Sequence, residues 1–257
     1  MRALVVVPTY DEVDSLATVV ERLGACDADA DVLVVDDASP DGTGQLADRL
    51  AVDHARLQVL HRAGKGGLGG AYRAGFAWGM QRGFDAFVEM DADLSHDPAD
   101  VPRLLRTLAG ADVVIGSRYV PGGRVLDWPP RRLALSRGGN RYVRLVTGLP
   151  VADATAGFRA YRRAVLEEVD LGTVSSDGYG FQVEMALRAW QTGFRVVEVP
   201  ITFTERRDGA SKMSRAIVAE AVLSVARWGL AGPRRAGAPH PRSVATSRAP
   251  SPEAAGA

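Results

Sequence analysis

Short runs of consecutive apolar residues alternate with longer segments of helical periodicity in the first part of the chain. The apolar runs are RALVVVP (2–8), DVLVVDD (31–37), ARLQVLHR (55–62), FDAFVEMD (84–91) and ADVVIGSRY (111–119), and the intervening segments predict helices within 11–25, 38–50, 67–83 and 97–110. Continuous apolar runs that alternate with helices are typical of parallel strands covered on both faces. The pattern therefore predicts an α/β fold with a mostly parallel sheet.

The pattern changes after Tyr119. The rest of the sequence predicts a loop at 120–130, a basic helix at 131–148, a turn and strand within 153–163, a helix at 178–193, a strand at 194–203 and a final helix at 211–230. From Ala231 onward, Pro, Ala, Ser and Arg dominate without an apolar period, as in disordered segments. We expect one domain at 1–230 and a disordered tail at 231–257.

The ends of the five predicted strands carry most of the unusual residues. These ends read PTYDE, DDASPDG, HRAGKGG, MDADLSH and GSRY, and each is polar or rich in glycine. In open parallel sheets, ligands bind beyond the carboxyl ends of the strands. We expect one edge of the sheet to hold the functional site.

Asp91 and Asp93 follow the fourth strand and point the same way if the extended conformation continues. Two carboxylates with this spacing suit Mg²⁺ or Mn²⁺, because they leave coordination positions for phosphate oxygens and water. The alternative is a solvated acidic turn, in which Asp97 is the N-cap ahead of Pro98. We assign Asp97 to that cap, and we expect His96 to be a neighbour of the metal rather than a ligand, since Mg²⁺ prefers oxygen.

Two further strand ends have more than one interpretation. The stretch GKGGLG (64–69) matches G-x-G-x-x-G, which invites comparison with dehydrogenases, but the dinucleotide fingerprint follows the first strand, and here that strand leads into PTYDE. A glycine-rich loop that opens a helix still offers amide groups to phosphate, and simple loop flexibility is the alternative. Asp36 and Asp37 are suited to bind a base or ribose, or Asp37 organises the SPDG turn.

Charge and composition narrow the class of protein. The net charge of zero argues against a nucleic-acid partner, but seven arginines and one acid lie between Arg118 and Arg144. Only two lysines occur, Lys65 and Lys212, both in glycine-containing loops, where either a compact ammonium group is needed or chance has left them. A single cysteine, Cys26, fits a reducing compartment.

Neither a signal peptide nor a membrane span is evident in the sequence, in which no window reaches ~18 apolar residues. The final helix places Ile217, Ala221, Val225 and Trp228 on one face, with Val218 and Val222 beside them. This face fits an interfacial helix near anionic headgroups, a dock for a separate membrane-anchoring subunit, or a cover for the core of the domain itself. We expect a cytoplasmic protein that lies peripherally on the cytoplasmic face of a membrane.

Many sequence blocks, taken in order over residues 1 to about 230, resemble the polyprenol-phosphate mannose synthases. These are family 2 glycosyltransferases of the dolichol-phosphate mannosyltransferase type, and they have a GT-A fold. The blocks are VVVPTYDE, VVDDASPDGT, GKGGLGGAYRAG, MDADLSH, GSRYVPGG, LSRGGN, DATAGFRAYRR, GYGFQVEM and VPITFTERRDGASKMS. A D-x-D motif alone is weak, but this number of ordered blocks is highly specific.

The resemblance implies that GDP-mannose is the donor and a polyprenyl monophosphate the acceptor. It places the donor at Pro8, Tyr10, Glu12, Val35 and Asp37, with Lys65 in the glycine-rich loop, and the pyrophosphate and its metal at Asp91, Ala92 and Asp93. It implies catalytic cations at Arg118, Arg206 and Lys212, and acceptor-phosphate contacts at Arg118, Arg132 and Ser136.

The sequence departs from the family pattern at two positions. Asp11 stands where many members have Asn, in the loop after the first strand. Ser95 stands where some members use Gln as a third metal contact, so the Ser95 hydroxyl or a water is expected there instead.

The expected reaction inverts the donor's α linkage to β and needs no strong general base. A phosphate monoester with a second pKa of ~6 is mostly dianionic at pH 7 and is already a nucleophile. The carboxylate that deprotonates sugar hydroxyls in other family 2 members has its nearest counterpart at Glu184. The alternatives are transfer of glucose or an amino sugar from a UDP donor, and, in another class, a non-catalytic nucleotide-binding partner.

Overall fold

The computed structural model describes residues 1–174, 176, 178–205 and 215–230, with 215–221 described as backbone only. The predicted tail at 231–257 lies outside the described residues. The predicted disorder of that tail therefore stays a prediction.

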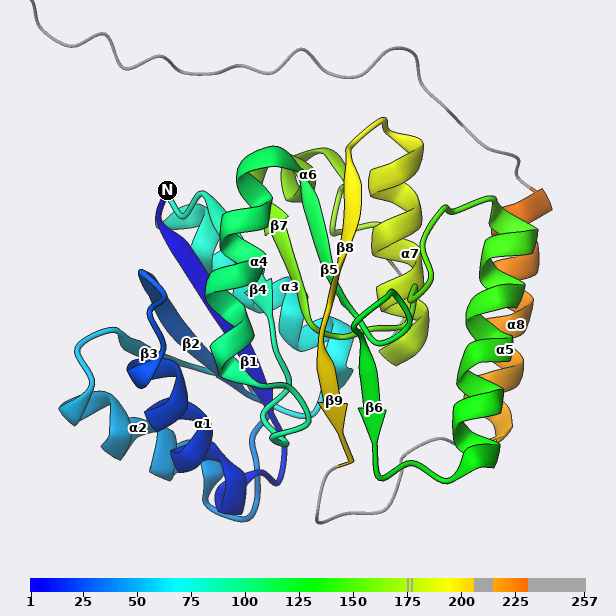
Figure 1. The fold of residues 1–257 in the computed structure, drawn as a ribbon. Helices are drawn as coiled ribbons and strands as arrows, with labels where there is room; N and C mark the ends of the chain where they lie inside the picture. Colours follow the sequence, from blue (N-terminus) through cyan, green and yellow to red (C-terminus); the bar gives the residue numbers. More distant parts are fainter. Residues whose placement is uncertain (175, 177, 206–214, 231–257) are drawn as a thin grey trace, which may run out of the picture.

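A seven-stranded sheet forms the centre of the protein (Figure 1). Its strands, in the order β3-β2-β1-β4-β7-β5-β8, are β3 (Leu57–His61), β2 (Ala30–Asp36), β1 (Ala3–Thr9), β4 (Ala86–Glu89), β7 (Arg159–Arg162), β5 (Val113–Ser117) and β8 (Val196–Pro200). β7 runs antiparallel to both of its neighbours, and the remaining pairs are parallel. The predicted α/β fold with a mostly parallel sheet is confirmed.

Helices cover both faces of the sheet (Figure 1). They are α1 (Val13–Ala25), α2 (Thr43–Asp53), α3 (Gly67–Gln81), α4 (Val101–Thr107), α5 (Pro130–Thr147), α6 (Arg163–Glu168), α7 (Gly178–Gln191) and α8 (Arg215–Leu230), with 3-10 turns η1 (Pro98–Asp100) and η2 (Leu108–Gly110) around α4. The period of two residues in β1 explains the layers, since Leu4 and Val6 face one core and Val5 and Val7 face the other.

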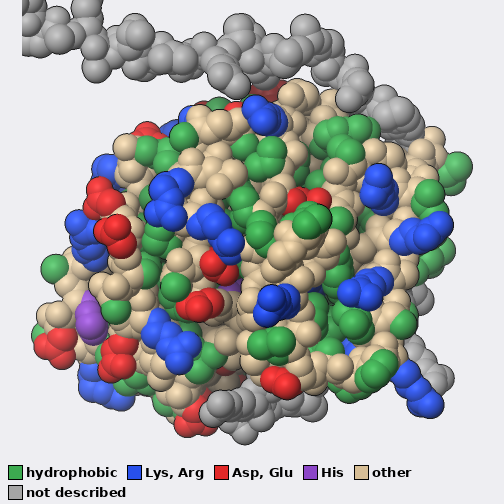
Figure 2. Space-filling model, in the orientation of Figure 1, with side chains coloured by type: hydrophobic (Ala, Val, Ile, Leu, Met, Phe, Trp, Pro, Cys, Tyr) green, Lys and Arg blue, Asp and Glu red, His purple; other side chains and the backbone are tan. Residues whose placement is uncertain are grey.

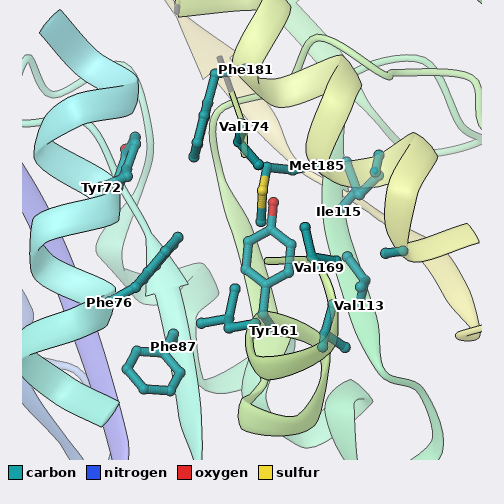
Figure 3. Packing of buried hydrophobic residues seen from close by; sticks show 14 of the residues in the cluster. Tyr72, Phe76, Phe87, Val113, Ile115, Tyr161, Val169, Val174, Phe181 and Met185 are labelled. Carbon is teal, nitrogen blue, oxygen red and sulfur yellow. The ribbon is translucent and has the colours of Figure 1, made fainter. Parts of the chain in front are cut away.

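An aromatic core lies between the sheet, α3 and α7 (Figure 3). The Tyr72 ring stacks on Phe76 and on Phe181, with 6.0 Å between ring centroids in each pair. The glycines of α3 permit this packing, because a Cβ added at Gly75 would lie 2.5 Å from Val6 Cγ1. The glycine-rich sequence of α3 therefore reflects a close approach between helix and sheet.

Three elements of the second half differ from the sequence-based expectation. The predicted loop at 120–130 contains a short strand, β6 (Arg124–Leu126), and the predicted strand at 194–203 divides into β8 and β9 (Thr202–Thr204). β9 leaves the main sheet to pair with β6, and the break falls at the buried Ile201. The short helix α6 was not predicted.

Helices α5 and α8 pack against each other at one end of the protein (Figure 1). The Tyr142 hydroxyl donates a hydrogen bond of 3.1 Å to the Val222 carbonyl. α5 begins with Pro130 and ends at Gly148, which has a φ of 73°. Among the described residues, no helix is both long enough and apolar enough to cross a bilayer.

We predict that Gly75→Ala destabilises the protein by about 1–3 kcal/mol, because its methyl group would overlap a buried valine. Urea unfolding measures this free energy. Gly24→Ala is the matched control, because an added Cβ at Gly24 meets no atom within 4 Å, and it should stabilise α1 by up to ~1 kcal/mol. Equal effects of the two substitutions would contradict the close approach of α3 to the sheet.

Candidate active site

A cavity of about 520 Å³ opens at the carboxyl ends of β1, β2 and β4, as the sequence predicts for the functional edge of the sheet. Of the residues expected to bind the donor, the cavity wall includes Pro8, Tyr10, Glu12, Asp37, Lys65, Asp91, Ala92 and Asp93. Val35 is different: its side chain is fully buried in the core, where it packs under Gly75 of α3. The roles of these residues in binding remain predictions.

The loop after β4 presents Asp91 and Asp93 to the cavity. Asp91 Oδ1 accepts a hydrogen bond of 3.2 Å from the Tyr72 hydroxyl, and Asp93 Oδ1 accepts one of 3.0 Å from the Ser95 amide. The Ser95 hydroxyl is buried and has no hydrogen-bond partner among the described residues. Asp97 accepts a hydrogen bond from the Ala99 amide ahead of η1, which confirms its predicted role as N-cap.

These residues fit a divalent cation of the hard, oxygen-preferring kind. The orphaned Ser95 hydroxyl lies in the same loop as the two carboxylates, and a Cβ added at Gly157 would lie 3.3 Å from Asp91 Oδ2. No group of three His, Cys, Asp or Glu side chains forms a metal cluster within the described ranges. A cation held here would therefore keep coordination positions for a ligand's oxygens and for water.

His96 lies beneath the acidic loop and is almost fully buried. Its ring stacks on Phe158 at 5.1 Å and meets Phe203 edge-on at 5.4 Å. Nδ1 lies 4.0 Å from Asp91 Oδ2 and has no hydrogen-bond partner in the part of the chain that the structure describes. Burial, with Arg118, lowers the pKa of His96 to about 4, which outweighs the rise that the carboxylates of Asp93 and Asp153 cause, so the ring is neutral at pH 7.

Glu89, the last residue of β4, is fully buried directly before this loop. Burial raises its pKa to about 8, and the guanidinium of Arg159 and the amide of Gln182 lower it less than burial raises it. Arg159 is itself fully buried and donates to the carbonyls of Ala154, Ala156 and Gln182 at 2.6–2.7 Å. Arg159, which lies opposite Glu89 of β4, thus connects β7 to the loop before it and to α7.

Asp36 and Asp37 have separate structural roles. Asp36 accepts hydrogen bonds from Thr9 and from the amide and hydroxyl of Ser39, so it organises the turn after β2. Asp37 pairs with Arg62 and accepts a 2.8 Å hydrogen bond from the Gly66 amide, so it anchors the glycine-rich loop. The expectation that Asp37 organises the SPDG turn is therefore wrong, while its carboxylate still lines the cavity.

Three loops at this edge contain a residue with positive φ that is not glycine. These residues are Asp11 (60°), Ala38 (57°) and Leu94 (62°), which follow β1, β2 and β4. Such conformations are costly for Ala and Leu and are concentrated at functional sites. At Asp11 the left-handed conformation suits Asn as well as Asp, which explains why either residue fits there.

Arg118 follows β5 and is held by Asp153 in a buried ion pair. Its Nε and Nη2 donate to the two carboxylate oxygens at 2.7 and 2.6 Å, and Nη2 also donates to the Thr155 hydroxyl. The Asp153 amide is in turn bound by Glu198 of β8. This fork–fork geometry leaves Nη1 of Arg118 as the group that an anion in the cavity would meet.

Arg132, in the first turn of α5, lines the same cavity as Arg118. Its guanidinium is 4.1 Å from the centre of the Trp128 ring and forms an ion pair with Glu205, the residue after β9. Ser136 lies one turn further on and accepts a 2.7 Å hydrogen bond from the Tyr119 hydroxyl. Basic side chains spread over the side of the protein where α5 lies (Figure 2).

A second, largely apolar cavity of about 140 Å³ adjoins the first and shares its wall at Arg118, Trp128, Arg132, Thr155 and Tyr179. It lies between α5, α7 and α8, and the rest of its lining is Leu135, Ser136, Gly139, Tyr142, Val143, Gly180, Val183, Val222 and Val225. Ser136 thus lies in this annex rather than in the larger cavity.

Sequence reasoning missed several residues of the site. Asp153 and Arg159 lie within the quoted block DATAGFRAYRR, but nothing in the sequence pairs them with Arg118 and Glu89. Glu205 was also missed. Glu184 does not line the cavity and pairs with Arg188 instead. Arg206 and Lys212 lie outside the described residues.

We predict that Glu89 makes the stability of the protein depend on pH. Its pKa is raised from an ordinary value of 4.5, so the folded state holds a proton that the unfolded chain releases. The stabilisation is complete below pH ~4.5 and is lost as the pH rises toward 8, by at most about 1.4 kcal/mol per pH unit. In urea unfolding, Glu89→Gln should remove this slope, whereas Glu167→Gln, at an exposed surface pair, should keep it. Parallel pH profiles for wild type and Glu89→Gln would contradict the raised pKa.

Comparison with known proteins gives the same family as the sequence blocks. Residues 4–170 match the model of glycosyl transferase family 2. An undecaprenyl-phosphate mannosyltransferase of Micrococcus luteus is 55% identical over 90% of this chain and 95% of its own length. A polyprenol monophosphomannose synthase of Mycolicibacterium smegmatis is also 55% identical, over 90% of this chain and 88% of its own length.

More distant proteins share the fold. A dolichol-phosphate mannosyltransferase of Pyrococcus furiosus is 35% identical over 88% of this chain and 63% of its own length. A crystal structure of glucosyl-3-phosphoglycerate synthase from Mycobacterium tuberculosis, in complex with Mn²⁺, UDP and glucosyl-3-phosphoglycerate, superimposes with a TM-score of 0.67 at 17% identity. The match covers 88% of this chain and 79% of the synthase chain. The chain belongs to glycosyl transferase family 2, in the group of the polyprenol-phosphate mannose synthases.

Proposed function

We propose that this enzyme transfers mannose from GDP-mannose to a polyprenyl monophosphate and gives polyprenyl-phosphate β-mannose. The single observation that carries the proposal is the division of one cavity into two charged walls beside an apolar annex. Asp91 and Asp93 form an acidic wall, and Arg118 and Arg132 form a basic wall. The names of the two relatives at 55% identity support the same donor sugar and acceptor class.

The acidic wall suits the donor. Asp91 and Asp93, with the Ser95 hydroxyl or a water, would hold Mg²⁺ or Mn²⁺, and such a cation neutralises charge on a departing nucleoside diphosphate. Tyr10 and Asp37 line the neighbouring part of the cavity, where the nucleoside is expected. Lys65 Nζ lies 3.7 Å from the centre of the Tyr10 ring and places a cation beside them. Arg206 and Lys212 are proposed as further cations for the diphosphate.

The basic wall suits the acceptor. A phosphate monoester is mostly dianionic at neutral pH, so it is a nucleophile without a general base. Asp153 fixes the Arg118 guanidinium, and the Arg132 guanidinium packs against the ring of Trp128. Guanidinium groups held in this way position phosphate oxygens at little entropic cost. Attack from this wall, opposite the departing diphosphate, inverts the sugar linkage.

The annex suits the first isoprene units of the acceptor. It is bounded by apolar side chains of α5, α7 and α8, and it opens from the wall that carries Arg118 and Arg132. Leu135 and Leu145 of α5 and Leu223 and Leu230 of α8 are exposed, and these helices pack together. We propose that this helix pair lies against the cytoplasmic face of a membrane, directly or through an anchoring subunit, so that the prenyl chain stays in lipid.

The decisive test incubates the purified protein with membranes, Mg²⁺ and radiolabelled GDP-mannose, UDP-glucose or UDP-N-acetylglucosamine in separate reactions. We expect label from GDP-mannose alone in the lipid extract. Asp93→Ala should lower turnover by about 100-fold or more, because its carboxylate no longer holds the cation.

Asp97→Ala is the matched control for Asp93→Ala. Asp97 belongs to the same loop, but it caps η1 and does not line the cavity. Its replacement should cost about 1 kcal/mol of stability and leave turnover near the wild-type value. Transfer from UDP-glucose instead of GDP-mannose would overturn the proposed donor, and full activity of Asp93→Ala would overturn the proposed metal site.

Two adjacent glycines of α5 test the prenyl site. A Cβ added at Gly138 or Gly139 meets no atom of the described side chains within 4 Å, but only Gly139 lines the annex. We predict that Gly139→Leu raises the KM for farnesyl phosphate by about tenfold, because the leucine fills space that an isoprene unit needs. Gly138→Leu should leave this KM unchanged. An equal KM for both variants would place the prenyl chain elsewhere.

A further inference from the structure

Glu205 is a carboxylate that lies among the groups expected to bind phosphate. It follows β9 directly and lines the larger cavity together with Arg118 and Arg132. The Thr204 amide, one residue earlier, donates a 3.1 Å hydrogen bond to the Ser95 carbonyl. The position of Glu205 is therefore fixed by the same loop that carries the two metal-site aspartates.

The Glu205 carboxylate forms an ion pair with the guanidinium of Arg132. Both of its oxygens accept hydrogen bonds from Nη1 of Arg132. About a quarter of each side chain is exposed, so the ion pair is partly shielded from water and faces the cavity. A carboxylate in this place is an oxyanion at a guanidinium that could otherwise bind phosphate oxygens.

Two anions at one guanidinium compete. If the acceptor phosphate takes the place of the carboxylate, the ion pair between Arg132 and Glu205 must first break. If the phosphate uses another edge of the guanidinium, a carboxylate a few ångströms away repels it. In either geometry, the negative charge of Glu205 weakens the binding of the acceptor.

We propose that Glu205 is an internal counter-ion for Arg132, which the acceptor phosphate displaces and which returns to Arg132 as the product leaves. The inference rests on the proposed function and names a residue that sets the affinity of its acceptor side. Before the acceptor binds, the pair keeps Arg132 against Trp128. After transfer, the carboxylate is already tethered beside the guanidinium, so it competes with the product at a high effective concentration.

The competing explanation is that Glu205 positions Arg132 for phosphate. The two explanations predict opposite signs. Removing a competitor tightens the binding of substrate and product by the same factor, because both must displace the same carboxylate. Removing a positioning group weakens the binding of both.

Isothermal titration with farnesyl phosphate and with its mannosyl phosphodiester separates these explanations. For Glu205→Gln we expect the Kd of both ligands to fall by about threefold to tenfold, the range for a partly exposed ion pair. Inhibition by the mannosyl phosphodiester should strengthen by the same factor. Glu167→Gln, which removes an exposed carboxylate of α6 that pairs with Arg163, should leave both Kd values unchanged.

A double-mutant cycle with Arg132→Ala adds a second measurement. In that background Glu205→Gln should tighten the binding of farnesyl phosphate by a smaller factor than it does beside Arg132, because the carboxylate no longer competes for that guanidinium. If the wild type binds farnesyl phosphate and Glu205→Gln binds it no more tightly, this inference alone is overturned. If the wild type binds no prenyl phosphate, the proposed acceptor is wrong and the inference fails with it.

Discussion

A guanidinium and a carboxyl group lie opposite each other inside the sheet, at Arg159 of β7 and Glu89 of β4. Burying either group alone in its charged form would be costly. Arg159 lowers the pKa of Glu89, but burial raises that pKa by more. The buried guanidinium also organises the backbone around it. Arg159 binds three carbonyl groups of the loop before β7 and of α7, and the same loop carries Asp153, which holds Arg118. The antiparallel strand β7 thus places a cationic wall beside an acidic one.

The division of charge across the cavity follows from the topology. Asp91 and Asp93 come after β4, a central strand, whereas Arg118 comes after β5, which β7 separates from β4. Arg132 belongs to α5, which starts after β6, a strand that pairs with β9 outside the main sheet. The proposed donor, with its diphosphate, and the proposed acceptor, with its phosphate, would therefore find groups of suitable charge on different elements. The net charge of zero for the whole chain hides this local separation.

Much of the fold could be predicted from the sequence, because consecutive apolar runs and the helical period determine where β1 to β5 and α1 to α5 lie. The edge of the sheet that holds the site also followed from the strand ends. The division of 194–203 into β8 and β9 could not be predicted, since apolar residues continue on both sides of Pro200 and only the pairing partner changes at Ile201. The ion pairs of Arg118 and Arg132 were not foreseen either, because they join residues 35 and 73 positions apart and no local pattern encodes them. The same holds for Arg159, which lies opposite Glu89 on the neighbouring strand.

The proposed reaction needs a divalent cation that Asp91 and Asp93 would hold incompletely, so that the donor's diphosphate would complete its coordination. Calorimetric titration of Mn²⁺ into the protein, with and without GDP, tests this most directly. Mn²⁺ should bind much more tightly when GDP is present, and the double variant Asp91→Asn/Asp93→Asn should lose this difference. Equal affinity for Mn²⁺ with and without GDP, or an undiminished difference in the double variant, would contradict the account.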